Sequence, residues 1–180
     1  MADAAFRQGF AQLQGHGLSF DAWIYHTQLT ELADLARAFP QTQIILDHVG
    51  TPLGLGPYAG RRAAVFQDWK HDIRSVAACE NVAVKLGGLA MKVCGFDWHK
   101  AQQPPVSQML AATMAPYIDY CLEQFGARRC MFESNFPVDK VSCGYTVLWN
   151  AFKRMTRSFS DEERAALFHD TAASVYRLKP

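Results

Sequence analysis

Two groups of polar residues stand directly after apolar, strand-like segments of this chain. Asp47 and His48 follow a β-branched run and precede a Val-Gly-Thr-Pro segment, which is rich in turn-forming residues. Glu133 and Asn135 likewise follow an apolar run and precede Phe-Pro. In parallel α/β folds the carboxyl ends of the strands form the mouth of the functional site. We therefore expect both groups to lie at one edge of a sheet.

A histidine at one strand end and carboxylate or carboxamide groups at another are what a hydrolytic site needs. One group polarises a carbonyl or holds a metal ion, and another acts as a base for water. We predict His48, Asn135 and Glu133 as catalytic residues, with His48 also the metal ligand. Alternation along a strand places His48 on the face of Ile44 and Leu46, and Glu133 about 7 Å deeper than Asn135.

Three further residues are predicted to bind substrate: Lys85, His26 and Trp98. Lys85 interrupts an apolar strand, where an unpaired buried ammonium is costly, although its long stem could also carry the charge out to the rim. His26 follows an aromatic strand-like segment. Trp98 belongs to the loop 96–105, where its exposure is either chance or a ligand contact.

Structural roles remain open for the same residues. His48 could satisfy backbone groups of its loop, and Glu133 to Asn135 could cap a turn. The other histidines are expected on the surface; they are His16, His71, His99 and His169.

Composition favours one globular domain that acts on small molecules. The chain has 180 residues, 49% of them hydrophobic, and a net charge of +1 from 18 basic and 17 acidic residues. This balance argues against partners such as nucleic acid or an anionic membrane. Five cysteines without a Cys-x-x-Cys pair indicate neither a disulfide framework nor a thiolate zinc site, so we expect reduced, mostly buried thiols. The amino terminus lacks a secretory signal pattern, which favours the cytoplasm.

Hydrophobic periodicity predicts strands that alternate with helices, and hence a parallel sheet with right-handed crossovers. Pro116 is expected in the first turn of its helix. The glycine-rich segment 50–60 is either a loop that covers a ligand or a plain connection. The predicted strands are 18–25, 43–48, 81–88 and 129–137, and the predicted helices are 4–15, 29–39, 65–77, 116–125, 147–155, one that begins at the capping box 160–163, and a last one that ends at 178.

Four segments together resemble the carboxyl-terminal part of the amidohydrolase-2 family; they are 45–52, 81–89, 131–138 and 172–178. The resemblance implies a TIM-barrel hydrolase, related to lactonases of the dicarboxylate, sulfomuconolactone and fuconolactone types. His48 matches a histidine of that family. Asn135 stands where the family carries an aspartate, and a neutral amide cannot act as a general base and ligates divalent metals more weakly.

The family's His-x-His pair is absent from these residues, and only four strand-helix units are present, whereas a (β/α)8 barrel typically takes about 250 residues. We therefore expect a partial (β/α)8 barrel: a single domain, 1–180, of four parallel strand-helix units with carboxyl-terminal helices, lacking the amino-terminal part. The expected function is hydrolysis of a lactone or similar cyclic ester, with zinc, manganese or no metal. The alternative is a catalytically inactive fragment that acts as a binding or assembly partner.

A sheet cut from a barrel should have two open edges and an apolar inner face in contact with water. We therefore predict self-association, as a homo-oligomer, or poor solubility. The residues expected to report this exposure are Ile44, Leu46, Val82, Val84, Met131 and Phe132.

Overall fold

The computed structural model describes residues 1–178 and centres on one parallel sheet with the strand order β1-β2-β3-β4. All three strand pairs are parallel, with Phe20 opposite Ile44, Ile44 opposite Val82, and Val84 opposite Cys130. The predicted strand order and direction are therefore confirmed. The strands are β1 (Phe20–Ala22), β2 (Ile44–Leu46), β3 (Val82–Leu86) and β4 (Cys130–Phe132).

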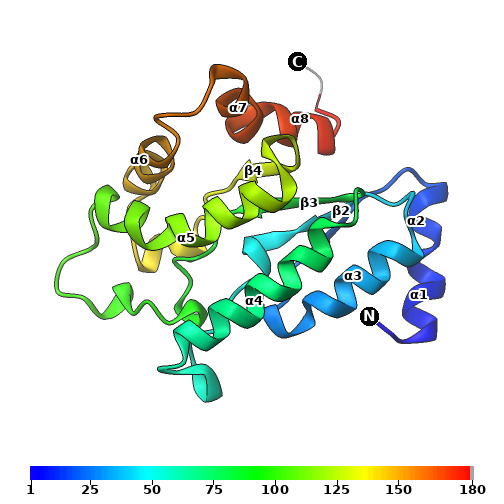
Figure 1. Cartoon of the computed structure of the whole chain (residues 1–180), viewed down its shortest axis with the longest axis horizontal. Coiled ribbons are helices and arrows are strands. Elements are labelled where there is room, and N and C mark those ends of the chain that lie inside the picture. Colours follow the sequence, from blue (N-terminus) through cyan, green and yellow to red (C-terminus); the bar gives the residue numbers. More distant parts are fainter. Residues whose placement is uncertain (179–180) are drawn as a thin grey trace.

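Helices connect the strands and cover the outer face of the sheet. Figure 1 shows α3, α4 and α5 side by side along this face, with α7 and α8 together beside β4. The predicted capping box is present, since the Ser160 hydroxyl accepts from the Glu163 backbone N–H. The helices are α1 (Ala4–Phe10), α2 (Gln12–Gly15), α3 (Leu29–Ala38), α4 (Arg62–Ala77), α5 (Ser107–Phe125), α6 (Tyr145–Met155), α7 (Asp161–Ala165) and α8 (Thr171–Val175).

The position predicted for Pro116 is wrong. Helix α5 begins at Ser107, so the proline lies inside the helix and not in its first turn. A proline in a helix interior costs about 3 kcal/mol because it lacks an N–H and clashes with the preceding turn. Leu110 and Met114, which precede it, are fully buried. Tertiary packing of this apolar face therefore overrides the local preference to start the helix at Pro116.

The two faces of the sheet bury different partners. Ile44, Leu46 and Val84 point to the helix layer and are completely buried in the main core. On the inner face, Ile45 and Met131 belong to a separate cluster that also includes Ala83. Residues of the carboxyl-terminal segment pack on this cluster: Ala172, Val175 and Tyr176.

The predicted exposure of the sheet is therefore wrong at the residues named for it. Each of the six is at most 8% exposed: Ile44, Leu46, Val82, Val84, Met131 and Phe132. These residues are buried because helices lie on both faces of the sheet: α3 to α5 cover one face, and α8 folds back over the other. Self-association of the chain stays a prediction.

The cysteine prediction is confirmed for the described chain. All five thiols are free and buried, at 79, 94, 121, 130 and 143. Within residues 1–178, the helices fall short of the length and apolar character needed to cross a lipid bilayer.

If α8 shields the inner face, a charge placed beneath it should destabilise the fold. We expect Val175→Asp to lower the free energy of unfolding by about 1–3 kcal/mol, because the carboxylate would lose water without gaining a partner. Urea unfolding followed by circular dichroism measures the change. Ser174→Asp, on the exposed side of the same helix, is the matched control. Equal stability of the two variants would contradict the packing described for α8.

Candidate functional site

A cluster of charged side chains joins the strands near their carboxyl ends. Lys85 Nζ on β3 donates to Asp21 Oδ1 of β1 at 2.6 Å, and it lies 2.8 Å from Asp47 Oδ1 after β2. The Tyr176 hydroxyl donates to the same Asp21 oxygen at 2.5 Å. Burial alone would lower the pKa of Lys85, but hydrogen bonds to Asp21, Asp47 and Tyr176 together raise it. Lys85, predicted to bind substrate, is therefore a charged and internally paired side chain.

His48 and Glu133, both predicted as catalytic, are brought into direct contact. His48 Nδ1 lies 2.5 Å from Glu133 Oε1, and the His48 backbone N–H donates to the same oxygen at 3.1 Å. Their side chains are only 13% and 16% exposed. Burial lowers the pKa of His48, but the hydrogen bond and the negative charge of Glu133 outweigh it and leave the pKa raised. Within residues 1–178, Nε2 has no hydrogen-bond partner.

A left-handed turn aims His48 at Glu133. The strand ends at Leu46, and His48 and Val49 have φ values of 56° and 48°. Alternation along the strand therefore stops before His48, and its predicted place on the face of Ile44 and Leu46 is wrong. The Trp69 indole N–H donates to the Val49 carbonyl at 2.7 Å and fixes the turn to α4.

Two glycines at the end of β3 make this contact sterically feasible. A Cβ on Gly88, whose φ is 67°, would lie 2.5 Å from His48 Cγ. A Cβ on Gly87 would lie 2.4 Å from both Glu133 Cγ and the Glu133 carbonyl oxygen. Any larger residue at either position would push the histidine and the glutamate apart, so the Gly-Gly pair is part of the site.

Asn135 contacts a carboxyl group that sequence reasoning missed. Its Nδ2 donates to Asp139 Oδ1 at 2.9 Å, and Asp139 is completely buried. Burial raises the pKa of Asp139 to about 7, although the Asn135 hydrogen bond and the charge of His48 lower it. Its other oxygen, Oδ2, is buried without a hydrogen-bond partner in the described part of the chain. Asp139 lies two residues after the Phe-Pro motif, and this position was the sequence signal that could have identified it.

The predicted depth relation between Glu133 and Asn135 does not hold. β4 ends at Phe132, and Asn135 has a φ of 50°, so the two residues do not belong to one continuous strand. Glu133 turns to His48, whereas Asn135 turns to Asp139.

His26 and Trp98 have structural contacts. The buried His26 Nδ1 accepts from the Leu53 backbone N–H at 3.3 Å, and burial lowers the pKa of this imidazole. Trp98 stacks on Phe96, with 4.8 Å between ring centroids. Their predicted role in substrate binding stays untested.

The segment 50–60 is attached to the protein at Gly54. Its backbone N–H donates to the Val93 carbonyl at 2.8 Å, and a Cβ there would lie 2.4 Å from the Cys94 carbonyl oxygen. This close backbone contact explains why position 54 is a glycine. It does not decide whether the segment covers a ligand or is a plain connection. Of the histidines expected on the surface, His16, His71 and His169 are exposed and His99 is half-buried.

Trp23 is a second residue that sequence reasoning missed. It follows β1 directly and is 60% exposed, and its ring meets that of His48 edge to face at 6.2 Å between centroids. Its position at the carboxyl end of a strand was the signal that could have identified it.

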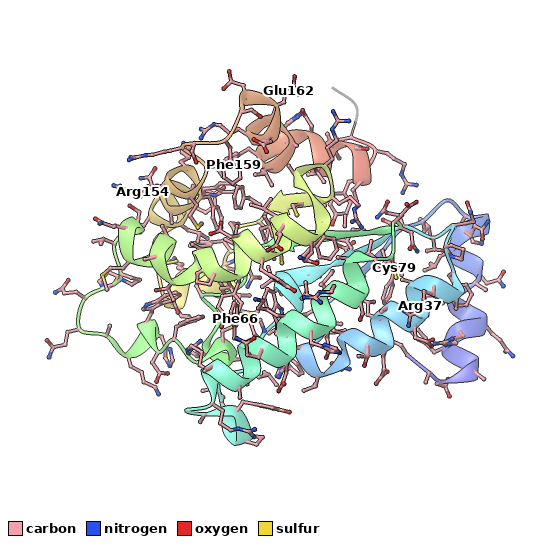
Figure 2. All side chains as sticks on the ribbon, viewed as in Figure 1. Arg37, Phe66, Cys79, Arg154, Phe159 and Glu162 are labelled. Carbon is pink, nitrogen blue, oxygen red and sulfur yellow. The ribbon has the colours of Figure 1, made fainter. Side chains whose placement is uncertain are left out.

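The larger hollows of the surface lie away from this edge. One of about 770 Å3 is bordered by Phe125 at the end of α5 and by Glu162 of α7. Another is bordered by Arg37 and Cys79, which Figure 2 shows together at the end of the molecule where the strands begin. We therefore place the candidate site by its chemistry, at the carboxyl edge of the sheet.

The described residues do not form a metal centre by themselves. Within residues 1–178 there is no group of three or more His, Cys, Asp or Glu side chains arranged to hold a metal ion. His48 Nδ1 is engaged with Glu133, and the Asn135 amide with Asp139.

Comparison with known proteins identifies relatives along the whole described chain. A family model described as amidohydrolase matches residues 1–178. An uncharacterized protein of Sinorhizobium fredii is 40% identical over 96% of this chain and 52% of its own length. L-fucono-1,5-lactonase of Burkholderia multivorans is 30% identical over 98% of this chain and 57% of its own length. The chain thus spans about half the length of these curated relatives.

Comparison with solved structures identifies the same family. A crystal structure of an amidohydrolase from Burkholderia multivorans, with bound zinc, superposes with a TM-score of 0.84 at 28% identity. The superposition includes 98% of this chain and 58% of the chain in the crystal structure. The α/β fold with parallel strands is therefore that of part of an amidohydrolase TIM barrel.

Asp139 should make stability depend on pH. Its pKa rises from 3.8 to about 7 on folding, so the folded chain holds a proton that the unfolded chain releases. The free energy of unfolding should therefore fall as pH rises from about 4 to about 7. Asp139→Asn cannot ionise, and we expect it to be more stable than the parent at pH 8 by about 1–4 kcal/mol.

Urea unfolding at pH 5 and pH 8 tests this expectation. Glu123→Gln, which changes an exposed carboxylate on α5, is the control and should leave the pH dependence unchanged. The same pH dependence in Asp139→Asn and the parent would contradict the assignment.

Proposed function

Since this chain belongs to the amidohydrolase family, we propose that it carries hydrolytic residues for opening a lactone or a similar cyclic ester. The observation that supports this most directly is the contact of 2.5 Å between His48 Nδ1 and Glu133 Oε1. A carboxylate that accepts a hydrogen bond from Nδ1 fixes the orientation and the tautomer of the imidazole ring. Nε2 is then the proton acceptor. As part of the same proposal, the chain is one domain that corresponds to the later part of a (β/α)8 barrel.

In the proposed reaction, water attacks the carbonyl carbon of the lactone. His48 Nε2 takes a proton from that water as the new C–O bond forms, and Glu133 stabilises the resulting imidazolium. The bond from the carbonyl carbon to the ring oxygen then breaks. His48 returns the proton to the departing ring oxygen, and the product is an open-chain hydroxy acid.

Asn135 has a positioning role in this proposal. An amide cannot remove a proton from water, but its oxygen can accept a hydrogen bond. The bond from Asn135 Nδ2 to Asp139 holds the amide in one orientation and leaves Oδ1 as the acceptor. Asn135 would thus orient the attacking water toward the carbonyl, while His48 serves as base.

Metal chemistry is not required by these steps. A bound zinc or manganese ion would polarise the lactone carbonyl and lower the pKa of a water ligand. His48 and Glu133 are the residues best suited to bind such an ion, but their side chains are hydrogen-bonded to each other. Because the described donors do not fit a metal centre, no step here depends on one, and use of zinc or manganese stays a proposal that metal titration can test.

A second candidate function is that of an inactive barrel fragment that binds or assembles with a partner, including another copy of the chain. The replacement of the family aspartate by Asn135 favours it, because a general base and a strong metal ligand are lost together. Activity measurements separate the two candidates, since only the hydrolase opens a lactone ring.

The first test is hydrolysis of a panel of neutral and carboxylated lactones, followed by acid release with a pH indicator. General acid-base catalysis typically contributes about 10²- to 10⁴-fold, so His48→Asn should reduce kcat/KM by that factor. Asparagine tolerates the positive φ of this position. His169→Asn changes an exposed histidine and is the matched control. Lactone hydrolysis that survives His48→Asn would refute the catalytic assignment, and no hydrolysis by the parent would support the second candidate.

The second test concerns the charge of Glu133. Because Glu133 raises the pKa of His48, Glu133→Gln should lower that pKa and move the acidic limb of kcat/KM to lower pH. NMR titration of the His48 ring reports the pKa directly, whatever the activity. Glu163→Gln, at the distant capping box, should leave the His48 titration unchanged. An unaltered pKa in Glu133→Gln would show that the pair is not formed in solution.

A further inference from the structure

Asp139 is a completely buried carboxyl group that reaches the candidate site through Asn135. Its Oδ1 accepts from Asn135 Nδ2 at 2.9 Å, and within residues 1–178 its Oδ2 has no hydrogen-bond partner. A buried polar atom without a partner costs free energy, so its presence in a folded chain needs an explanation. In the proposed hydrolysis Asn135 orients water, which makes the state of its buried neighbour important.

The two protonation states of Asp139 need opposite partners. A carboxylate only accepts hydrogen bonds, so the amide of Asn135 presents Nδ2 to it. A neutral carboxyl group carries an O–H that has to donate, so the amide must then present Oδ1. The Ala90 backbone N–H, which favours the charged form of Asp139, cannot accept that proton. Unless the amide turns, the O–H of a neutral Asp139 would be buried without an acceptor in the described part of the chain.

The Asn135 amide has the freedom to make this turn. The oxygen and the nitrogen of an asparagine amide are similar in size, so a half-turn about the Cβ–Cγ bond leaves the shape of the side chain almost unchanged. Asn135 is half-buried, and its Oδ1 is free of hydrogen bonds to residues 1–178. The half-turn therefore replaces an acceptor by a donor on the side of the amide that faces away from Asp139.

Asp139 is the ionisable group that contacts this amide. Burial raises its pKa to about 7, the charge of His48 lowers that pKa, and the charge of Glu133 raises it. Two thiols also face Asp139, and burial raises the pKa of Cys94 to about 12 and that of Cys143 to about 11. Both thiols therefore stay protonated near neutral pH, where Asp139 changes its charge.

We propose that Asp139 is a positioning residue whose proton sets the direction of the Asn135 amide: ionised Asp139 turns the amide oxygen toward the attacking water, and neutral Asp139 turns the amide nitrogen toward it. This inference rests on the proposed hydrolase. The attacking water donates one O–H to His48 Nε2 and the other to Asn135 Oδ1, which leaves a lone pair for the carbonyl carbon. An amide N–H would instead bind that lone pair and oppose the attack.

The first test follows the hydrogen bond itself by NMR of the full chain. We expect a scalar coupling across the hydrogen bond between Asn135 15Nδ2 and Asp139 13Cγ at pH 9 and its loss at pH 5, with the midpoint of the Asp139 13Cγ titration. The Asn81 amide is the matched control, because its Nδ2 donates to three backbone carbonyls, which do not ionise. A coupling between Asn135 and Asp139 that is the same at both pH values would overturn the inference.

Two variants separate the proton of Asp139 from that of His48. In Asp139→Asn the chemical shifts of the Asn135 amide should no longer change with pH. In His48→Asn they should still change, with a midpoint at higher pH, because the charge of His48 lowers the pKa of Asp139. A titration of the Asn135 amide that survives Asp139→Asn, or that disappears in His48→Asn, would assign the turn to His48 and contradict the role of Asp139.

The pH profile of lactone hydrolysis gives the functional readout. Attack requires two deprotonated groups, His48 and Asp139, so log kcat/KM should rise with a slope of about 2 on the acidic side and with a slope of about 1 in Asp139→Asn. A slope of 1 in the parent would overturn the positioning role. An amide that turns with pH in a chain without lactonase activity would retain the pair of Asp139 and Asn135 and reject the hydrolase. Hydrolysis together with a pH-independent coupling would do the reverse.

Discussion

The ion pairs of Lys85 are the interaction on which the sheet and its carboxyl edge depend. A partly buried ammonium needs partners, and here Asp21 belongs to β1 and Asp47 directly follows β2, the two strands that precede β3 in the sheet. Tyr176 shares the Asp21 oxygen, so the carboxyl-terminal segment is tied to the same centre. Removing Lys85 would leave two neighbouring carboxylates uncompensated, which makes the cluster sensitive to strand order and register.

The same edge shows why small residues and left-handed backbone are needed next to the catalytic pair. Gly87 and Gly88 leave space that a Cβ would fill, and the positive φ of His48 turns its ring into that space. The short contact between His48 and Glu133 results from these backbone features together. Since Lys85 is neutralised internally, the polarity of the site is set by carboxylates, and an apolar indole stands at its margin.

Several features of this protein could be predicted from local patterns. Alternating apolar runs and turn residues indicated four parallel strands in chain order, and polar residues after β2 and β4 indicated that His48 and Glu133 lie at one edge. The capping box at Ser160 and the burial of the cysteines also followed from local composition. These predictions succeed because apolar periodicity and capping residues are local signals, and because helical crossovers between consecutive strands give parallel pairing.

Which side chains meet was decided only by the tertiary structure. The contacts of His48 with Glu133 and of Lys85 with Asp21 span 85 and 64 residues, and alternation does not carry through the turns that follow β2 and β4. The place of Pro116 inside α5 and the cover that α8 provides for the inner face depend on packing, which outweighs local propensity. By itself the sequence determined the strands and the residue types at their ends. Their partners required the folded chain, because hydrogen bonds and burial between distant segments leave no periodic signal in the sequence.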